Sequence, residues 1–284
     1  MILRHVTTTD GVRLALYRAR ADRAGRPAVL LLHGMFSNHG VFLRPIDRGP
    51  GLAPVLAERG LDVWLADFRH HGGSDREPAP RRWTFEDWIR ADLPALAREV
   101  GGETGGAPLA WVGHSAGGVT ALCALAENAP LRRQVAAVVT LGVPGPKRMG
   151  ALRWSLAALS ALLSPPFGRF PARALRMGPE DEAARVLSQW MGWNARGRWS
   201  SRDGFDYLAA LSSVPTPLFA VAGEADRIFA PPARCRELFD AWGAPGKRFA
   251  VARDLDHRGL LIDPRARDST WPALGAWLEE TLDR

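Results

Sequence analysis

Short apolar runs alternate with amphipathic segments along most of this chain, and this alternation restricts the possible folds more than any other feature. Six runs have the length and composition of buried strands: residues 28–32, 61–66, 109–112, 135–141, 218–222 and 248–252. Segments with helical character lie between or after them, at residues 52–59, 84–100, 116–127, 231–242 and 270–282. The pattern predicts an α/β fold, with helices on both faces of a mostly parallel sheet.

A hairpin precedes this alternation, because residues 6–8 and 13–17 flank the turn sequence Asp10-Gly11. Its two strands bring the predicted sheet to eight strands. Residues 145–214 show helical spacing and no convincing strand. We therefore predict a core domain of residues 1–144 and 215–284, with a helical cap of residues 145–214 inserted after the sixth strand.

The composition is that of a globular protein: 46% of the residues are apolar, 24% are charged, and the formal charge is +7. Lysine occurs only at Lys147 and Lys247, and the arginines are scattered along the chain. A nucleic-acid surface would show a dense basic stripe instead, so we expect no nucleic-acid partner. Weak contact with an anionic lipid surface stays open.

Neither a secretory signal nor a run of about 18 apolar residues is found, so we expect a cytoplasmic protein without a membrane-spanning segment. Cys123 and Cys235 are too few for a disulfide framework or a four-ligand zinc site. Both fall in predicted helices, where they resemble small core residues. A single bridge between them remains an alternative.

The pentapeptide Gly113-His114-Ser115-Ala116-Gly117 has the pattern G-x-S-x-G. A buried strand leads into it and an alanine-rich helix follows, which is the setting of a nucleophile elbow. Small residues on either side allow a sharp turn that projects the Ser115 hydroxyl. At the helix N-terminus, the helix dipole favours a developing anion. We therefore predict that Ser115 is a nucleophile.

A serine nucleophile needs a base and a carboxylate that orients this base. His257 is the one histidine that is both late in the chain and in a loop after a predicted strand. Asp226 follows the strand at 218–222 and is the preferred carboxylate, with Glu224 as the alternative. The order Ser115, Asp226, His257 matches that of acyl-transfer triads on such sheets.

Two main-chain amides are predicted to bind the oxyanion. Ala116 directly follows the nucleophile, so its amide is the first donor. His33-Gly34 ends the first strand of the parallel part, and the amide of Met35 is the second predicted donor.

These pieces together resemble the α/β-hydrolase superfamily. The resemblance implies serine-hydrolase chemistry without a metal or organic cofactor. Residues 67–74, Asp-Phe-Arg-His-His-Gly-Gly-Ser, are similar to that family's D-x-R-G-H-G-x-S loop, except that His70 replaces the first glycine. No third metal ligand is evident beside His70 and His71, so we interpret both as structural.

Four segments are similar to the acid-lipase branch of the superfamily: residues 60–67, 205–207, 214–217 and 223–226. The resemblance implies a relative of bacterial esterases and lipases. The predicted cap contains many aromatic and aliphatic residues, which either line an acyl pocket or pack the cap onto the core. We predict that Phe36, His114, Trp154 and Trp190 contact the substrate.

The preferred function is hydrolysis of carboxylic esters with medium to long acyl chains, a class of substrate that includes small-molecule esters and lipids. A thioesterase or acyltransferase would use the same acyl enzyme, so both remain alternatives. A non-catalytic binding protein on this fold is a further alternative, although such proteins commonly lack a member of the triad.

Overall fold

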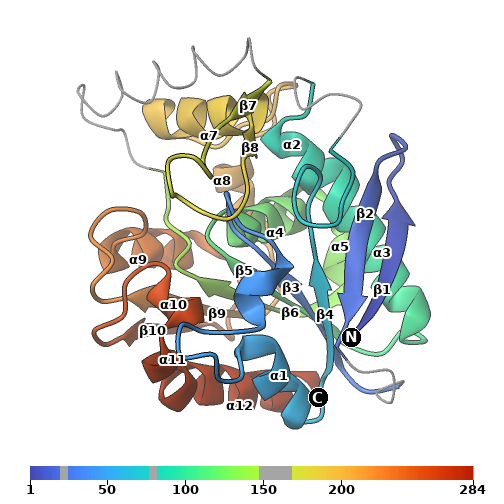
Figure 1. The fold of residues 1–284 in the computed structure, drawn as a ribbon. Helices are drawn as coiled ribbons and strands as arrows, with labels where there is room; N and C mark the ends of the chain where they lie inside the picture. The colour runs from blue at the N-terminus through green and yellow to red at the C-terminus, as the bar shows by residue number, and fades with distance from the viewer. Residues whose placement is uncertain (20–24, 77–81, 147–167, 284) are drawn as a thin grey trace.

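A computed structural model describes residues 1–19, 25–76, 82–146 and 168–283 of the chain (Figure 1). Within these residues, eight strands form one sheet in the order β1-β2-β4-β3-β5-β6-β9-β10. The strands are β1 (Ile2–Thr7), β2 (Arg13–Arg18), β3 (Ala28–Leu32), β4 (Asp62–Ala66), β5 (Leu109–His114), β6 (Val135–Leu141), β9 (Leu218–Gly223) and β10 (Arg248–Ala252). Within this sheet, β1–β2 and β2–β4 pair antiparallel and the other neighbours pair parallel, so the predicted mostly parallel sheet is confirmed.

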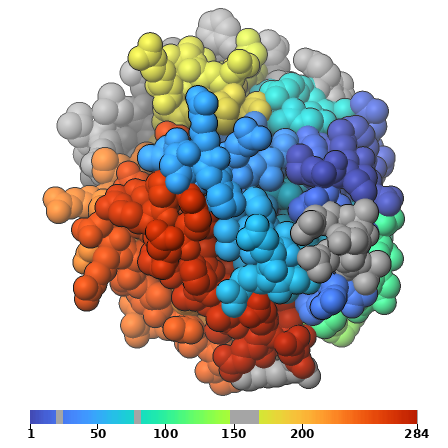
Figure 2. All heavy atoms as spheres, turned by 60° about the horizontal axis from the view of Figure 1, so that its bottom comes forward, coloured from blue at the N-terminus to red at the C-terminus, as the bar shows by residue number. Residues whose placement is uncertain are grey.

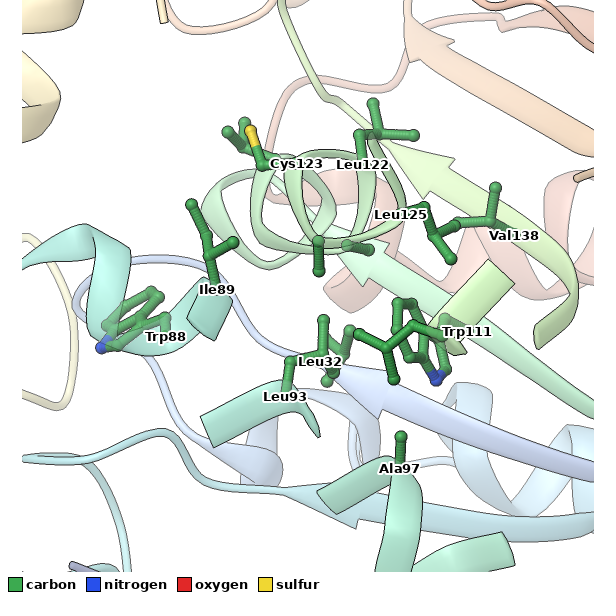
Figure 3. Close-up of a cluster of buried hydrophobic side chains, with 14 of the residues drawn as sticks. Leu32, Trp88, Ile89, Leu93, Ala97, Trp111, Leu122, Cys123, Leu125 and Val138 are labelled. Atoms are coloured by element: carbon green, nitrogen blue, oxygen red, sulfur yellow. The ribbon is translucent and has the colours of Figure 1, made fainter. Parts of the chain in front are cut away.

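Alternate residues of the central strands enter two separate hydrophobic clusters. In β3, Leu30 and Leu32 join one cluster, whereas Val29 and Leu31 join the other, as the two-residue period of a strand requires. The first cluster lies under α3 (Leu93–Glu103) and α4 (Ala116–Glu127), and Figure 3 shows α4 packed over β5. The sheet is therefore buried on both faces.

The opposite face is covered by α1 (Leu52–Glu58), α10 (Gly259–Ile262), α11 (Pro264–Asp268) and α12 (Thr270–Leu282). Helices α1 and α12 pack side by side on the face that Figure 2 brings forward. The core also contains α5 (Ala129–Gln134) and α9 (Pro232–Ala241). Each parallel strand is thus followed by at least one helix.

The helix predicted at residues 84–100 is divided, as its proline requires. It consists of α2 (Phe85–Asp87), a π-helical segment η3 (Trp88–Asp92) and α3, with Pro94 in the first turn of α3. Proline cannot donate a main-chain hydrogen bond, so it is tolerated in a first turn and disrupts a helix interior. A capping box between Thr84 and Asp87 starts the segment.

The prediction that residues 145–214 contain no strand was wrong. The described part of this segment, called the insertion below, contains a two-stranded sheet of β7 (Arg169–Phe170) and β8 (Glu182–Ala183). Strands of two residues are too short to produce a recognisable period in the sequence. The sheet is followed by α7 (Ala184–Arg196), α8 (Tyr207–Ala210) and η5 (Leu211–Ser213).

Aromatic side chains join the insertion to the core. Trp193 is buried, and its ring lies 5.3 Å from that of Phe85 in the core. Within the insertion, the same ring lies 5.8 Å from that of Tyr207 and 6.3 Å from that of Trp199, which is also buried. For these residues, packing of the insertion onto the core is therefore the interpretation that the structure supports. In Figure 1, α7, β7 and β8 lie at the top of the molecule, next to α2.

Cys123 in α4 and Cys235 in α9 are both buried with free thiols, so no bridge joins them. Both thiols lie within helices, as predicted from the sequence. Of the helices formed by the described residues, none combines the length and the apolar character needed to span a bilayer.

Candidate active site

The pentapeptide around Ser115 forms a sharp turn between β5 and α4. Ser115 has φ +51° and ψ −122°, a conformation that side chains rarely adopt outside functional sites. A Cβ atom at Gly117 would lie 2.4 Å from the carbonyl oxygens of Leu32 and His33. The glycine is therefore required, because the start of α4 crosses the end of β3 in close contact.

Asp226 lies in the loop after β9 and His257 in the loop after β10, and their side chains are in contact. The Nδ1 atom of His257 lies 2.7 Å from Oδ2 of Asp226, and Asp226 is buried. Its carboxylate also accepts main-chain hydrogen bonds, from the amides of Phe229 and Ala230 at 2.9 Å each. Burial favours a raised pKa for Asp226, but His257 and these amides outweigh it and lower the pKa. Asp226 is thus held in its ionised form.

The other carboxylates near His257 in sequence have different partners. Glu224, the alternative carboxylate, accepts a hydrogen bond from the amide of Asp254 at 3.1 Å. Asp256 accepts one from the amide of Gly259 at 2.6 Å. Within the described structure, none of the carboxylates of Glu224, Asp254 and Asp256 forms a hydrogen bond or an ion pair with the His257 ring.

Ser115 and His257 both adjoin the carboxyl end of β6. The amide of Ser115 donates to the carbonyl of Leu141 at 3.0 Å. The next residue, Gly142, lies against His257, because a Cβ atom there would be 3.1 Å from Nδ1 of the histidine. The end of a single strand therefore locates both the serine and the imidazole. Three of the predicted site residues, Ser115, Asp226 and His257, are gathered at one edge of the sheet.

His114 lies beside His257 and contacts its main chain. Its Nε2 donates to the carbonyl oxygen of His257 at 2.9 Å, and the two rings are 4.8 Å apart. Burial lowers the pKa of His114 to about 3, with a further contribution from His257, so the ring is neutral. The predicted substrate contact of His114 stays a prediction, while the contact observed here links the Ser115 turn to the His257 loop.

The loop after β3, residues 33–38, approaches Ser115 and is called the β3 loop. A Cβ atom at Gly34 would lie 3.0 Å from Cβ of Ser115, so Met35 follows at the point where this loop passes the serine. Ala116, the other predicted donor, is the first residue of α4, where a main-chain amide has no partner within the helix. Both predicted oxyanion donors therefore lie in segments that adjoin Ser115.

His33 is a structural residue that holds the β3 loop. Its Nε2 accepts from the amide of Phe68 at 3.1 Å, and its Nδ1 donates to the carbonyl of Gly34 at 2.8 Å. Burial lowers the pKa of His33 to about 4, which keeps the ring neutral and preserves both hydrogen bonds.

Residues 67–76, called the β4 loop, wrap around the buried carboxylate of Asp67. It accepts from the amide of His39 at 2.7 Å and from that of Gly73 at 2.9 Å. Its pKa falls to about 2, because hydrogen bonds and charge from His39 and His33 outweigh burial. His70 has φ +74°, which explains why the family pattern has glycine at this position.

His71 forms a buried ion pair with the insertion. Its Nε2 lies 3.3 Å from Oε2 of Glu182 in β8, and both side chains are fully buried. Burial alone would lower the pKa of His71, but Glu182 outweighs it and raises the pKa. Among the described residues, no group of three or more His, Cys, Asp or Glu side chains is arranged to hold a metal ion.

Two residues predicted to contact the substrate have contacts with other aromatic side chains. The ring of Phe36 lies 5.8 Å from that of Phe170 in β7. The ring of Trp190 stacks on Phe85 at 5.6 Å, so it joins the aromatic packing between insertion and core. Trp154 lies outside the described residues.

Sequence reasoning missed Phe229, whose ring lies 5.1 Å from that of His257. Nothing in the sequence pattern distinguishes Phe229 from other loop residues, except that it follows Asp226 by three positions.

The chain belongs to the alpha/beta hydrolase fold family, whose model matches residues 27–264. Human lipase member K is 32% identical over 143 residues, which are 46% of this chain and 36% of that protein. The chain thus spans only about a third of the length of this curated relative.

Solved structures of the same fold cover nearly the whole chain. The monoacylglycerol lipase of Paleococcus ferrophilus superposes with a TM-score of 0.65 at 18% identity, covering 94% of this chain and 99% of that chain. A thermophilic esterase from Thermogutta terrifontis gives a TM-score of 0.67 at 17% identity, covering 99% of each chain. At these identities the likeness shows the fold, and the chemistry has to be argued from the site.

Proposed function

We propose that the protein is a serine hydrolase that cleaves carboxylic esters through an acyl-enzyme intermediate. The observation that carries this proposal is the 2.7 Å contact between Asp226 and His257, which lie beside the strained turn of Ser115. Lipases among the curated relatives support the same class of reaction.

In the proposed mechanism, Ser115 attacks the ester carbonyl and His257 accepts the proton of its hydroxyl. Asp226 holds the imidazole in the orientation that presents Nε2 to the serine. The amides of Met35 and Ala116 stabilise the oxyanion, and His257 then protonates the leaving alcohol. Water, activated by His257, releases the acid from Ser115.

Exposed apolar side chains near His257 support a preference for medium to long acyl chains. Ile228 and Phe229, in the loop after Asp226, are 62% and 56% exposed. Leu175 and Met177, 56% and 40% exposed, lie in the insertion just before Gly178, which packs against Phe36 of the β3 loop. Large exposed apolar residues next to a site favour apolar ligands. We propose that residues 145–214 act as a cap over an acyl-binding region.

The test is hydrolysis of p-nitrophenyl esters with acyl chains from C2 to C16 by the wild-type protein and by Ser115→Ala. We expect activity to peak at C8 or longer and to be lost in Ser115→Ala. Asp226→Asn should lower kcat by about 10³–10⁴, because the imidazole loses its orienting partner. Glu224→Gln is the matched control and should retain activity.

A peak at C2–C4 would retain the serine hydrolase but contradict the preference for long chains. If no ester is cleaved, labelling of Ser115 by a fluorophosphonate would favour the thioesterase or acyltransferase alternative, which acyl-thioester substrates would then test. A wild-type protein that is inactive and unlabelled would favour a binding protein.

A further inference from the structure

The main chain of the insertion rests directly on the β3 loop. The amide of Glu180 donates to the carbonyl oxygen of Phe36 at 3.1 Å. Gly178 packs so closely that a Cβ atom there would lie 2.1 Å from the same carbonyl oxygen. Any other residue at position 178 would displace this loop, so the two segments are fitted to each other.

The carboxylate of Glu180 extends this contact to Asn38 in the same loop and to the β4 loop. Its Oε1 accepts from Nδ2 of Asn38 at 2.7 Å and from the amide of Gly72 at 3.1 Å. Its Oε2 accepts from Arg76 at 2.8 Å. Glu180 is only 5% exposed, so these hydrogen bonds are poorly replaced by water.

The hydrogen bonds also keep the Glu180 carboxylate ionised. Burial would raise its pKa, but the hydrogen bonds from Asn38 and Arg76 outweigh burial and lower it. Asn38 in turn accepts from the amide of Gly40 at 2.9 Å and thereby starts the short helix η2 (His39–Phe42). One residue of the insertion thus contacts both ends of the β3 loop's second half, Phe36 through its main-chain amide and Asn38 through its carboxylate.

Phe36 needs such support, because its φ is +61°. A residue other than glycine in this region is strained and keeps its conformation only where its surroundings impose it. Phe36 directly follows Met35, whose amide is a proposed oxyanion donor. The main-chain amide of Glu180 holds the carbonyl group of Phe36, and the carboxylate of Glu180 holds Asn38 two residues further on, so the loop is fixed where it leaves that donor.

We propose that Glu180 is a positioning residue that holds the β3 loop so that the Met35 amide points at the oxyanion. This inference rests on the proposed function and adds to it. The insertion then does more than bind the acyl chain, because docking it onto the core also completes the stabilisation of the transition state.

A purely structural role for Glu180 would affect folding and leave the turnover of folded protein unchanged. The insertion has other anchors that should keep it docked without Glu180. The His71–Glu182 ion pair is one, and the main-chain amide of Glu86, which donates to Gln189 at 3.2 Å, is another. Loss of the Glu180 carboxylate should therefore act locally on the β3 loop.

The experiment compares Glu180→Ala and Glu180→Gln with the wild-type protein, using the best ester of the chain-length series. Glu180→Ala should lower kcat by about 10–100-fold with KM within about 2-fold, because a donor misplaced by about 1 Å loses most of its effect. Inhibition by a trifluoromethyl ketone of the same acyl chain, which forms a tetrahedral oxyanion on the serine, should weaken by the same factor.

Glu180→Gln keeps an acceptor for Asn38 and Gly72, so it should restore kcat to within a few-fold of wild type. Asp181→Asn is the matched control, because the contacts of Asp181 are with Arg169 and the amide of Arg173, both within the insertion. This variant should keep the kcat of wild type. Circular dichroism and gel filtration establish that each variant is folded.

A folded Glu180→Ala variant with the kcat of an active wild type would refute the inference and leave the proposed function intact. A change in KM alone, or a kcat that falls without weaker inhibition by the ketone, would refute it as well. A wild-type protein that neither hydrolyses esters nor reacts with a fluorophosphonate would refute both.

Discussion

Ser115 is held in a backbone conformation that stores strain. With φ at +51° and ψ at −122°, its Cβ atom lies close to the main chain, whereas glycine adopts the same region freely. The turn persists because β5 and α4 are both buried and fix its two ends. The proposed chemistry requires a side chain at position 115, although the backbone conformation there favours glycine.

We therefore expect Ser115→Gly to be more stable than Ser115→Ala by about 1 kcal/mol. Both variants remove the hydroxyl and should be inactive, but only glycine relieves the strain at positive φ. Chemical denaturation of the two variants measures the difference. A Ser115→Ala protein as stable as Ser115→Gly would show that the turn is not strained.

Single residues also show what could be foreseen at this scale. Loop position favours Asp226 over Glu224 as the orienting carboxylate, and the structure places Asp226 against His257. The hydrogen bond from His114 to the carbonyl of His257 was not foreseen, because it joins residues 143 positions apart. No local pattern encodes a contact of that kind.

At the scale of elements, the crossing of β3 and α4 depends on glycine. Gly117 is buried where the helix starts, and Gly113 is equally restricted, since a Cβ atom there would lie 2.4 Å from Cα of Gly118. The main chain itself forms these contacts, so no side-chain movement relieves a clash. Sequence reasoning could predict this requirement because the elbow is a contiguous pattern.

We expect Gly117→Ala to destabilise the fold by about 3 kcal/mol or more, since overpacking against main chain cannot be relieved. Gly101→Ala is the matched control, because this glycine lies in α3 with nothing within 4 Å of an added Cβ atom. It should stabilise the protein by about 0.5–1 kcal/mol. Thermal or urea denaturation measures both, and a Gly117→Ala protein of wild-type stability would contradict the crossing described here.

At the scale of the whole molecule, three neutral histidines are buried in different places. Burial lowers the pKa of His33 and His70 to about 4 and that of His114 to about 3, from the ordinary value of 6.5. The unfolded chain binds protons at these sites below pH 6.5, whereas the folded chain does so only near pH 4. Stability must therefore fall as the pH decreases through this window.

Around pH 5 the unfolded chain binds about three more protons at these sites than the folded chain, so the free energy of unfolding changes by about 4 kcal/mol per pH unit. His71 does not offset this loss, because its raised pKa makes it protonated in both states below pH 6.5. We expect Tm to fall by about 10 °C between pH 6.5 and 5. Differential scanning fluorimetry across this range measures the effect.

His70→Gln should reduce this slope by about a third, the contribution of one of the three protons. The reason is that the His70 ring nitrogens are buried and have no hydrogen-bond partner within the described structure. His5→Gln is the control, since His5 is exposed on β1 and should leave the slope unchanged. A Tm that stays constant from pH 6.5 to 5 would contradict the prediction.

The sequence by itself determined the sheet, the elbow and the family, because each depends on local periodicity or on a contiguous motif. The chain order Ser115, Asp226, His257, with Asp226 and His257 each in a loop after a predicted strand, also allowed the triad to be predicted. Only the tertiary structure decided how the insertion joins the core. The contacts of Glu180 with Phe36 and of Glu182 with His71 link segments more than 100 positions apart. Their geometry follows from the packing of many elements at once, which no local pattern in the chain records.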